Sequence, residues 1–343
     1  MRILMIGGTR FIGPPVVRLL AELGHHVALF HRRPPEVELP PDVQHILGDR
    51  RDHLADYAET FRRFEPDVVV DMIPITERDA QMVVGTFKGM TYRVVAISSQ
   101  DVYRAYGRVN GTEPGPADPT PLTEDSPLRE RLYPYRGDTP RAPNDPTRLF
   151  DDYEKILVER VIMSDPGLPG TVLRLPMIYG PHDYQHRVHQ YLRRMDDGRP
   201  AIVVSDQMAR WRWTRDYVEN TAAAIALAIT DDRAAGQIYN IGEMPALTLA
   251  EWIERIGLIA GWDGEVVVAP DYQLPEDMRA QAGFDQDLVA DSSRIRDELG
   301  YQQPVHLDEA LRETIAWERA NPPAHADPPQ PDYNTEDTIL ARL

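Results

Sequence analysis

The sequence predicts an α/β fold built on a doubly wound parallel sheet. Two observations predict it. Short apolar runs alternate with helical stretches through the first half of the 343-residue chain, and a glycine-rich turn follows the first run. Ligands bind such sheets at the carboxyl ends of the strands, so we look for functional residues there.

The expected strands are short and apolar. They are Arg2–Ile6, 26–30, 43–47, 67–73, 93–99 and 171–175. A helix is expected over 11–23, where apolar residues recur at helical spacing. Pro14 and Pro15 fit only near the start of this helix, and Gly24 ends it.

The composition excludes several kinds of site and partner. The chain has no cysteine, which excludes disulfides, thiolate metal sites, iron–sulfur clusters and cysteine nucleophiles. Asp and Glu outnumber Lys and Arg by 55 to 37, and the resulting net charge of −18 repels phosphate polymers. We therefore expect no nucleic-acid partner, although a few local arginines can still hold a small phosphate.

Targeting signals are not evident in the sequence. Residues 1–12 lack the cleavage site of a secretory signal, and no apolar run approaches the about 20 residues that span a bilayer. We expect a cytoplasmic protein with no membrane partner.

The stretch MIGGTRFIG (5–13) is expected to bind a dinucleotide. Gly7 permits the tight turn, Gly8 adds local freedom, and Gly13 allows close packing of helix and strand. The helix N-terminus that follows would face a pyrophosphate. We expect the cofactor site to include the whole turn, that is Gly7, Gly8, Thr9, Arg10, Phe11, Ile12 and Gly13. The alternative is a tight turn that holds no ligand.

Basic residues favour NADP over NAD as the cofactor. Arg10 replaces the expected middle glycine of the turn. The second strand leads into His31, Arg32 and Arg33, where an NAD-binding protein usually has an acid for the ribose hydroxyls. These side chains can form a pocket for a 2′-phosphate. Alternatively, Arg32 and Arg33 belong to a solvated loop and the cofactor is NAD.

Several motifs together resemble the extended short-chain dehydrogenase/reductase superfamily, atypical members included, and its NAD(P)-dependent epimerase/dehydratase family. They are GGTRFIG (7–13), GDRRD (48–52), ISSQDVY (97–103), LRLPMIYGP (173–181), DSSRIRDELGY (291–301) and LDEALRETIAW (307–317). The resemblance implies a Rossmann domain over 1–175, a smaller C-terminal α+β region over 176–321 that binds substrate, and a homodimer.

The resemblance also gives single residues expected roles. Asp49 is expected to contact adenine, with Arg50 beside it. Ser99 takes the place of the Ser/Thr that binds the reacting oxygen of the substrate, and Pro176 lies in the segment that lines the nicotinamide.

On the substrate side, the resemblance points to three more residues. Met177 replaces an asparagine with which many relatives contact a substrate phosphate, which favours a less charged ligand or phosphates held elsewhere. The segment RDYV resembles one whose arginine grips a pyrophosphate, so Arg212 and Arg215 are both candidates. Alternatively, these arginines face water or pair with Asp216 and Glu219.

The family's chemistry uses a tyrosine that moves a hydroxyl proton and a lysine four residues later, on the same helix face. Lys155 fits the lysine, but Asp151 stands at the tyrosine position. Tyr153 is only two residues before Lys155, roughly 200° around a regular helix, and would point away from it.

Three interpretations of this site are open. In the first, Asp151 is itself the acid/base, although a carboxylate beside a lysine is a weak base for an alcohol. In the second, the helix starts late or is distorted, and Tyr153, Tyr133 or Tyr135 supplies the phenol. In the third, the tyrosine function is lost and the protein binds a dinucleotide without redox turnover.

Three segments remain. Residues 112–147 are rich in proline, so we expect neither a helix nor a central strand there, and the resemblance places them over the active site as a lid; the alternative is a long surface loop. Residues 322–343 are expected to form a flexible tail. His182, His186 and His189 have helical spacing, but we read them as a helix start beside the substrate and expect no metal.

We therefore expect an NAD(P)-dependent epimerase, dehydratase or ketoreductase. It would act by hydride transfer on a hydroxylated, sugar-like small molecule, either free or as a nucleotide-sugar. The alternative is a catalytically diverged dinucleotide sensor or an RNA-binding member of the superfamily without redox turnover, since the same glycine variant resembles chloroplast stem-loop RNA-binding members.

Overall fold

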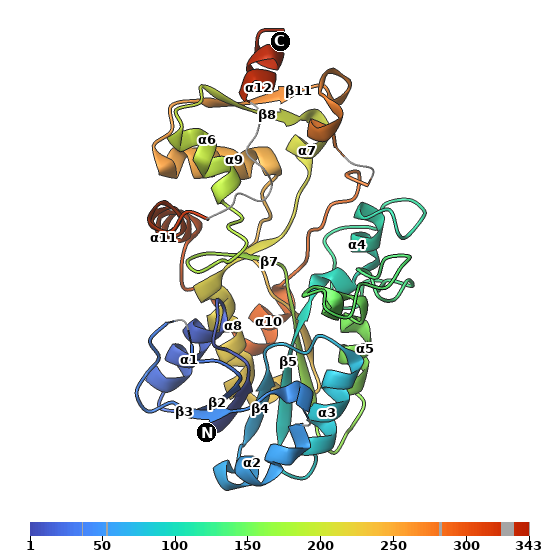
Figure 1. The fold of residues 1–343 in the computed structure, drawn as a ribbon, viewed down its shortest axis with the longest axis vertical. Coiled ribbons are helices and arrows are strands. Elements are labelled where there is room, and N and C mark those ends of the chain that lie inside the picture. Colours follow the sequence, from blue (N-terminus) through green and yellow to red (C-terminus); the bar gives the residue numbers. More distant parts are fainter. Residues whose placement is uncertain (36, 53, 281–282, 324–332, 343) are drawn as a thin grey trace.

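The structure is a computed structural model that describes residues 1–35, 37–52, 54–280, 283–323 and 333–342. A lower part is built on a seven-stranded sheet and an upper part on two pairs of short strands (Figure 1). The proline-rich insertion and the short helix α4 (Arg104–Val109) lie to one side, where the two parts meet.

The large sheet is entirely parallel, in the order β3-β2-β1-β4-β5-β6-β10. Its strands are β1 (Arg2–Ile6), β2 (His26–His31), β3 (Gln44–Leu47), β4 (Val68–Asp71), β5 (Arg93–Ser99), β6 (Gly170–Leu175) and β10 (Ile238–Asn240). The strand order reverses at β1, and Ile6 lies opposite both Phe30 of β2 and Asp71 of β4. The strands therefore end level with one another at the point where such sheets bind ligands.

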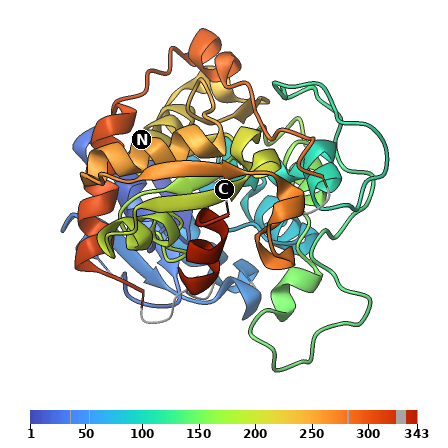
Figure 2. The same cartoon turned by 90° about the horizontal axis from the view of Figure 1, so that it is seen from above.

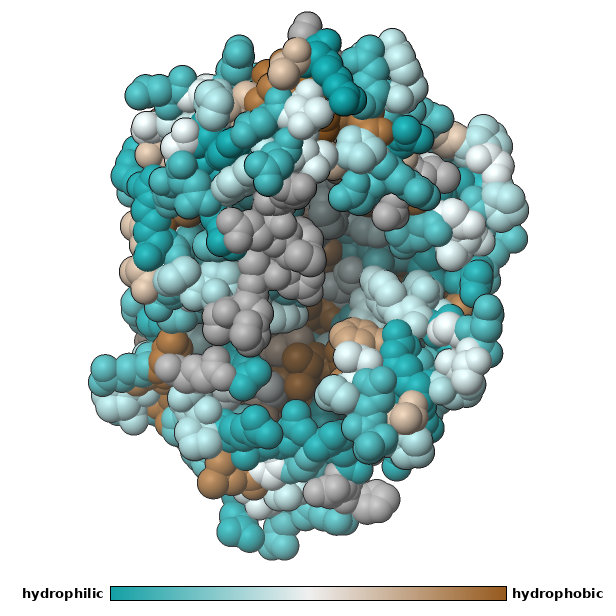
Figure 3. All heavy atoms as spheres, turned by 45° about the horizontal axis from the view of Figure 1, so that its top comes forward, coloured by the Kyte–Doolittle hydropathy of each residue, from teal (hydrophilic) through white to brown (hydrophobic). Residues whose placement is uncertain are grey.

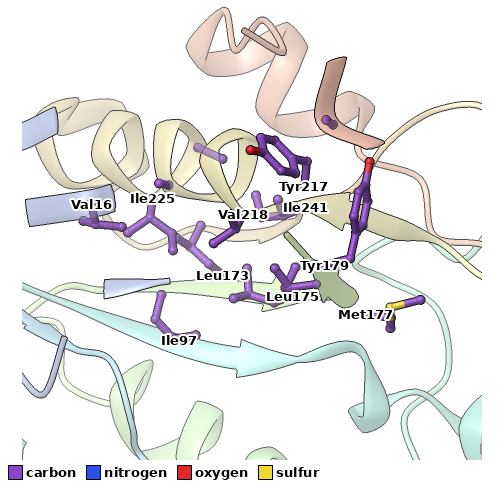
Figure 4. Packing of buried hydrophobic residues seen from close by; sticks show 14 of the residues in the cluster. Val16, Ile97, Leu173, Leu175, Met177, Tyr179, Tyr217, Val218, Ile225 and Ile241 are labelled. Atoms are coloured by element: carbon purple, nitrogen blue, oxygen red, sulfur yellow. The ribbon is translucent and has the colours of Figure 1, made fainter. Parts of the chain in front are cut away.

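Helices cover both faces of this sheet. One face packs against α1 (Gly13–Glu22), α8 (Val218–Thr230) and α10 (Ser293–Leu299), and the other against α2 (Ala58–Phe64), α3 (Glu77–Phe87) and α5 (Lys155–Ile162). Figure 4 shows the first face, where Ile97 and Leu173 of the strands lie below Ile225 of α8 and Val16 of α1. Burial on both faces explains why the strand sequences are nearly continuous apolar runs.

The upper part contains two parallel strand pairs. They are β7 (Met177–Tyr179) with β9 (Arg215–Tyr217), and β8 (Ala201–Ser205) with β11 (Glu265–Ala269). Around them pack α6 (His189–Asp196), α7 (Asp206–Arg210), α9 (Leu249–Ala260) and α11 (Leu307–Ala320). At the far end, α12 (Tyr333–Leu340) lies against β8 (Figures 1 and 2).

The strand predictions are confirmed, with small changes at the ends. The first helix begins at Gly13 rather than at Phe11, which has a positive φ of 44°. Pro14 and Pro15 occupy its first turn, and Gly24 follows its end with a φ of 79°, as expected. Within the insertion 112–147, the structure has only two isolated bridges, which agrees with the expectation of neither helix nor central strand.

The predicted division at residue 175 is too simple. The strand β10 pairs with β6 at the edge of the large sheet, and α8 and α10 pack on its face, although all three lie beyond residue 175. The chain beyond residue 175 returns to the large sheet because the edge of β6 and one apolar face of this sheet would otherwise be exposed.

The expectation of a flexible tail is wrong for residues 333–340. This segment forms α12, whose Ile339 is only 6% exposed and packs with Val203 and Leu274. Arg194 of α6 donates to Glu336 of α12 at 3.0 Å. Arg199 also pairs with Asp337, and Tyr333 donates to Asp197 at 2.6 Å, so apolar and charged contacts together dock this helix. Residues 324–332 of the tail lie outside the described residues.

The surface is mainly hydrophilic on the face shown in Figure 3, and the strongly hydrophobic residues seen there include a group in a hollow near its centre. Among the described residues, no helix combines the length and the apolar character that crossing a membrane requires.

Candidate functional site

A cleft of about 730 Å³ lies along the carboxyl edge of the large sheet. Its walls come from the turn after β1 and from the ends of β2, β4, β5 and β6, with one residue from the end of the proline-rich region. The lining includes residues 6–13, 30–33, 48–50, 72–73, 97–99 and 175–176. The fold thus brings together the glycine turn, the basic residues after β2, Ser99 and Pro176, which are far apart in the sequence.

The glycine turn has the tight backbone that was expected. Gly7 and Gly8 have φ values of 87° and 89°, which side chains rarely allow. A Cβ atom on Gly13 would lie 2.3 Å from the backbone of Gly8. The close approach at Gly13 is therefore to the turn itself, rather than to the strand as the sequence suggested.

The turn, rather than the first turn of α1, supplies the amide donors. Pro14 and Pro15 have no amide hydrogen, and the amide of Gly13 donates to the carbonyl of Arg10 at 2.9 Å. The amide of Gly7 donates to the carbonyl of Phe30 at 2.9 Å, so a phosphate at this end of the helix would be held by amides between Gly8 and Ile12, with the helix dipole adding positive potential.

Two arginines contact Asp49, Arg32 after β2 and Arg51 after β3. Arg51 donates to Asp49 at 2.7 Å and Arg32 lies 3.5 Å from it. The hydrogen bond from Arg51 lowers the pKa of Asp49 to about 2. Arg10, His31, Arg32, Arg33 and Asp49 all line the cleft, and Arg32 and Arg33 are exposed.

His31 is held on both ring nitrogens. Its Nδ1 lies 2.6 Å from the carbonyl of Arg33 and its Nε2 lies 2.8 Å from His45. The ring is buried, and burial lowers its pKa. The side chain therefore shapes the wall at the end of β2.

Arg50 lines the cleft but its guanidinium is already engaged. It donates to both oxygens of Asp71 at 2.6 and 2.8 Å, and also to the carbonyls of Ile73 and Asp79. Arg50 therefore connects the segment after β3 to the end of β4. Only the backbone of Arg50 and the carbon chain of its side chain therefore remain for the expected contact with adenine.

Ser99 lies at the end of β5, on the wall of the cleft. Its Oγ accepts the amide of Asp101 at 3.2 Å and so caps the short turn that follows. The hydroxyl hydrogen of Ser99 is not used by this cap, so Ser99 can donate it elsewhere.

Helix α5 begins only at Lys155, with Glu154 as an extended N-cap residue at φ −157°. Asp151 ends a separate 3₁₀ turn, so Asp151 and Lys155 do not share a helix face. Tyr153 also precedes the helix, and the Nζ of Lys155 lies 5.7 Å from the centre of its ring. The geometry of the second interpretation, a late helix start that lets Tyr153 approach Lys155, is present in the structure.

Lys155 is buried behind the wall of the cleft. Its Nζ donates to the carbonyls of Pro74 at 2.7 Å and Ile97 at 3.0 Å. Burial lowers the pKa of Lys155 to about 8, although the negative charges of Asp101 and Asp71 act in the opposite direction.

Asp101, which the sequence analysis did not single out, accepts hydrogen bonds from two tyrosine hydroxyls of this region. Tyr153 donates to its Oδ2 at 2.8 Å and Tyr135 of the insertion donates to the same oxygen at 2.9 Å. Burial, together with the charge of Asp101, raises the pKa of Tyr153 well above its usual value. The only signal in the sequence was the position of Asp101 two residues after Ser99.

Asp151 is bound to the insertion instead. Its carboxylate accepts the amide of Arg141 at 2.8 Å and also binds the Arg141 guanidinium. The amide hydrogen bond is the main reason that its pKa is lowered. Asp151 does not line the cleft.

The insertion is fastened to the start of α5 by a buried ion pair that the sequence did not indicate. Arg129 donates to Glu154 at 3.1 Å, and its Nε donates to the carbonyl of Asp101 at 2.5 Å. The amide of Tyr133 also donates to Glu154, at 2.5 Å. Tyr135 therefore reaches Asp101 from an anchored segment, whereas Tyr133 has only this backbone contact with the site.

A second cavity of about 360 Å³ lies in the upper part, around Arg215. Arg215 is 5% exposed and its guanidinium lies 4.6 Å from the ring centre of Trp252. One nitrogen donates to the carbonyl of Trp213 at 3.1 Å, whereas the buried Nε has no hydrogen-bond partner among the described residues. Burial lowers the pKa of Arg215 to about 10.

Glu243 lines the same cavity. It accepts a hydrogen bond from Tyr179 of β7 at 2.8 Å, and burial raises its pKa to about 7. Ile178, next to Tyr179, lines the large cleft. The short strand β7 therefore connects the walls of the two cavities.

The other substrate candidates lie elsewhere. Arg212 is exposed and lines neither cavity, and Met177 is buried in the core. The expected alternative partners of the arginines are engaged differently, because Asp216 accepts from Thr221 at 2.6 Å and Glu219 lies 3.7 Å from Arg18.

The three histidines pack against α11. His186 lies 2.7 Å from Glu318 and stacks on Trp317, which also contacts His182, while His189 begins α6. Within the described ranges, no three His, Asp or Glu side chains are placed to hold a metal ion. The same segment contributes Tyr184 and Arg187 to the wall of the cleft, two residues that no motif had indicated.

A protein-family profile matches most of the chain. The profile described as the NAD dependent epimerase/dehydratase family matches residues 3–242.

Several curated relatives match most of the chain, and two of them are described here. The 2'-dehydrokanamycin reductase of Streptomyces kanamyceticus is 26% identical over 301 residues, covering 86% of this chain and 75% of that protein. The chloroplast stem-loop binding protein of 41 kDa b of Arabidopsis thaliana is 24% identical over 361 residues, covering 99% of this chain and 84% of that protein.

Among solved structures, a UDP-glucuronic acid 4-epimerase from Bacillus cereus, in complex with UDP-glucuronic acid and NAD, has the same fold. Its TM-score is 0.66 at 18% identity, and the match covers 93% of this chain and 99% of that one.

Proposed function

The chain belongs to the NAD dependent epimerase/dehydratase family, and on this premise we propose that it is an NAD(P)-dependent enzyme that moves hydride at a hydroxylated carbon of a sugar-like substrate. One observation carries the proposal. The cleft of about 730 Å³ joins the glycine turn, the basic end of β2 and Ser99 in a single site. If the turn held no ligand, its own structure would not explain why Ser99 and Pro176 line the same cleft.

The residues of the cleft fit a dinucleotide. The turn from Gly7 to Gly13 leaves no room for a Cβ at Gly13, and the amides between Gly8 and Ile12 are the ones it can present to a phosphate. When bound, the dinucleotide supplies the hydride donor or acceptor. Arg32 and Arg33 are exposed on this wall, and with Arg10 they favour the 2′-phosphate of NADP.

Tyr153, rather than Asp151, takes the place of the family's tyrosine in this proposal. The late start of α5 brings the Tyr153 ring to Lys155, and the Tyr153 hydroxyl donates a hydrogen bond to Asp101. Asp151 is bound by Arg141 and lies outside the cleft. Lys155 acts through its charge and holds the strand ends by its bonds to two carbonyls.

The substrate carries an anionic group that the cavity around Arg215 binds. Arg215 is buried with an unpartnered Nε, and Trp213 and Trp252 offer flat apolar walls. A guanidinium in such a setting suits a phosphate or carboxylate next to a ring. Nucleotide-sugars and acidic sugars both combine these features. The proline-rich insertion covers the site through Tyr135, and by resemblance the protein forms a homodimer.

The first experiment is a fluorescence titration of the purified protein with NADPH and with NADH. We expect tight binding of NADPH and weaker binding of NADH. Turnover is then sought with UDP-glucose, UDP-glucuronic acid, dTDP-glucose and 2'-dehydrokanamycin. Absence of binding for both dinucleotides would refute the proposed function.

A second candidate is a binding protein without redox turnover. The similarity to the chloroplast stem-loop binding protein over 99% of this chain favours it, whereas the net charge of −18 opposes RNA binding. Tyr153→Phe and Lys155→Met separate the two functions. An enzyme loses turnover in both variants, and a binding protein keeps its ligand affinity.

A further inference from the structure

We propose that Arg187 binds the pyrophosphate of the dinucleotide, so that a side chain from the upper part of the molecule completes the phosphate site of the glycine turn. The inference rests on the proposed function, because that function places a dinucleotide in the cleft. It gives a role to a residue of the cleft wall that no motif had indicated.

The segment 181–187, which follows β7, lies against the middle of the glycine turn. The ring of Tyr184 contacts the ring of Phe11 edge-on, with 6.4 Å between the ring centres. The start of the segment lines a small cavity of about 120 Å³ together with residues 9–11 of the turn. Its other end, Arg187, lines the large cleft, as does the whole turn. The segment therefore passes beside the part of the turn whose amides are available to a phosphate.

The turn by itself offers a phosphate few hydrogen-bond donors. The amides of Gly7 and Gly13 already donate to backbone carbonyls, each at 2.9 Å. Pro14 and Pro15 have no amide hydrogen, so the first turn of α1 adds no donor there. The neutral amides over residues 8–12 remain for a pyrophosphate, which is doubly charged. An arginine beside the turn supplies both positive charge and further hydrogen bonds.

Arg187 is the arginine of the cleft wall that is still available for this role. Arg50 is engaged by a buried carboxylate and two carbonyls. In the proposed function, Arg10, Arg32 and Arg33 belong to the 2′-phosphate at the adenosine end of the dinucleotide. Apart from these four, Arg187 is the one arginine of the described ranges that lines the cleft.

Arg187 is held in position before a ligand binds. Its Nη1 donates to Oδ1 of Asp183 at 2.6 Å and to the carbonyl of Ile178 at 3.0 Å. Asp183 is only 1% exposed, and it also accepts the amides of Gln185 at 3.0 Å and of Arg187 at 3.2 Å. A guanidinium fixed in this way loses little conformational entropy when it binds a ligand.

The remaining nitrogens of Arg187 provide the contact. Its Nε and Nη2 make no hydrogen bond within the described part of the chain, and the side chain is 24% exposed on the cleft wall. The planar fork of a guanidinium matches two oxygens of a phosphate. Because Asp183 balances the charge of Arg187, directed hydrogen bonds rather than net charge account for the expected affinity.

The first test compares three ligands that share a pyrophosphate. NADPH, NADH and ADP-ribose are titrated by calorimetry into the full-length wild-type protein and into Arg187→Met. We expect the three dissociation constants to rise by a common factor of at least about 10, because a hydrogen bond to a charged group contributes this much. Arg187→Lys should recover only part of the affinity, since it lacks the planar fork. Unchanged dissociation constants in Arg187→Met would overturn the proposal.

Two further variants exclude an indirect effect. Arg193→Met removes another arginine that pairs with an aspartate four residues away, Asp197 at 3.8 Å, but that lies outside the cleft. It should bind all three ligands as the wild type does, and an equal loss in this variant would contradict a specific role for Arg187. Arg187→Met combined with Asp183→Asn leaves no unpaired buried carboxylate, so it measures the same loss if Arg187→Met alone does not fold.

UDP separates a phosphate of the dinucleotide from a phosphate of the substrate. It has the diphosphate of a nucleotide-sugar but is not part of a dinucleotide. We expect Arg187→Met to bind UDP as the wild type does, while its affinity for ADP-ribose falls. If the affinity for UDP falls and that for ADP-ribose stays, Arg187 binds the substrate and the proposal is wrong.

Failure of the proposed function gives a different result. A wild-type protein that binds NADH without turnover of any substrate of the panel refutes hydride transfer, and the titrations still decide the role of Arg187. Conversely, turnover together with unchanged ligand affinities in Arg187→Met refutes only the role of Arg187. A wild-type protein that binds none of the three ligands refutes both.

Discussion

The two cavities of the molecule are built from different parts of the chain. The cleft at the sheet edge is lined largely by backbone turns at strand ends, with Gly7, Gly8 and Gly13 at its centre. The cavity around Arg215 is made by side chains, chiefly Arg215 and Trp252, from segments that meet only in the folded protein. A backbone site can be read from local sequence, whereas a side-chain site depends on how distant segments pack.

The difference extends to their electrostatics. In the cleft, the buried Arg50 forms an ion pair with Asp71 through two of its nitrogens, while its Nε lacks a hydrogen-bond partner among the described residues. In the second cavity, Arg215 keeps an unpartnered nitrogen and Glu243 has a pKa raised to about 7 by burial. Unpaired buried groups cost stability, so they indicate a site that a ligand completes.

The largest expected effect concerns the backbone of the cleft. In Gly13→Ala, the new Cβ would lie 2.3 Å from the backbone of Gly8, so the turn must open. We expect the dissociation constant for NADPH to rise at least about 100-fold, which corresponds to about 3 kcal/mol. Fluorescence titration measures it.

Gly85→Ala is the matched control, because a Cβ on this exposed glycine of α3 meets nothing within 4 Å. Equal NADPH affinity in Gly13→Ala and Gly85→Ala would mean that the turn does not shape the cofactor site.

The next effect concerns the side-chain cavity. Arg215→Met should raise the KM for a phosphorylated substrate of the panel about 30-fold, because a charge-assisted hydrogen bond contributes about 2 kcal/mol. The free energy of unfolding should stay equal or rise, since an unpaired buried cation is removed. Steady-state kinetics and urea unfolding measure the two effects.

Arg212→Met provides the comparison, since Arg212 is exposed and lines neither cavity. A similar KM increase in both variants would exclude a specific role for Arg215.

A smaller effect tests the basic wall of the cleft. Replacing Arg32 and Arg33 with alanine together should raise the dissociation constant for NADPH about 10-fold, or about 1.4 kcal/mol, and leave that for NADH unchanged. Arg63→Ala is the control, because Arg63 lies on α2, outside the cleft, and pairs with Glu59 at 3.6 Å. A parallel loss for both dinucleotides would mean that the pair does not contact the 2′-phosphate.

The last effect is a dependence of stability on pH. Burial raises the pKa of Glu243 from 4.5 to about 7, so between these values the folded protein holds a proton that the unfolded chain releases. The free energy of unfolding should therefore fall as pH rises through this window. Glu243→Gln removes this contribution, at most about 1.4 kcal/mol per pH unit. Urea unfolding at pH 5, 6 and 7 measures the slope.

Glu251→Gln serves as its control. The amide hydrogen bond of Thr248 lowers the pKa of Glu251, so this group titrates below the window. If Glu243→Gln and the wild type have parallel stability curves, Glu243 is not held in its neutral form.

Local sequence determined the sheet and the cofactor turn of this protein. Apolar runs buried on both faces, prolines confined to the first turn of α1, and glycines at positive φ are consequences of short-range sterics and solvent exclusion. These rules act within a few residues, so Gly7, Gly13 and the strand ends could be located without the fold. The same local reading misjudged residues 333–340, because the contacts that dock α12 lie more than 60 residues away.

Only the tertiary structure decided the acid/base site. The regular spacing of a helix would separate Tyr153 from Lys155, and it was the late start of α5, held by the Arg129–Glu154 ion pair, that brought them together. Tyr135 reaches Asp101 across 34 positions of sequence. Such contacts arise from packing between distant segments, whose geometry is set by the whole core rather than by any local pattern.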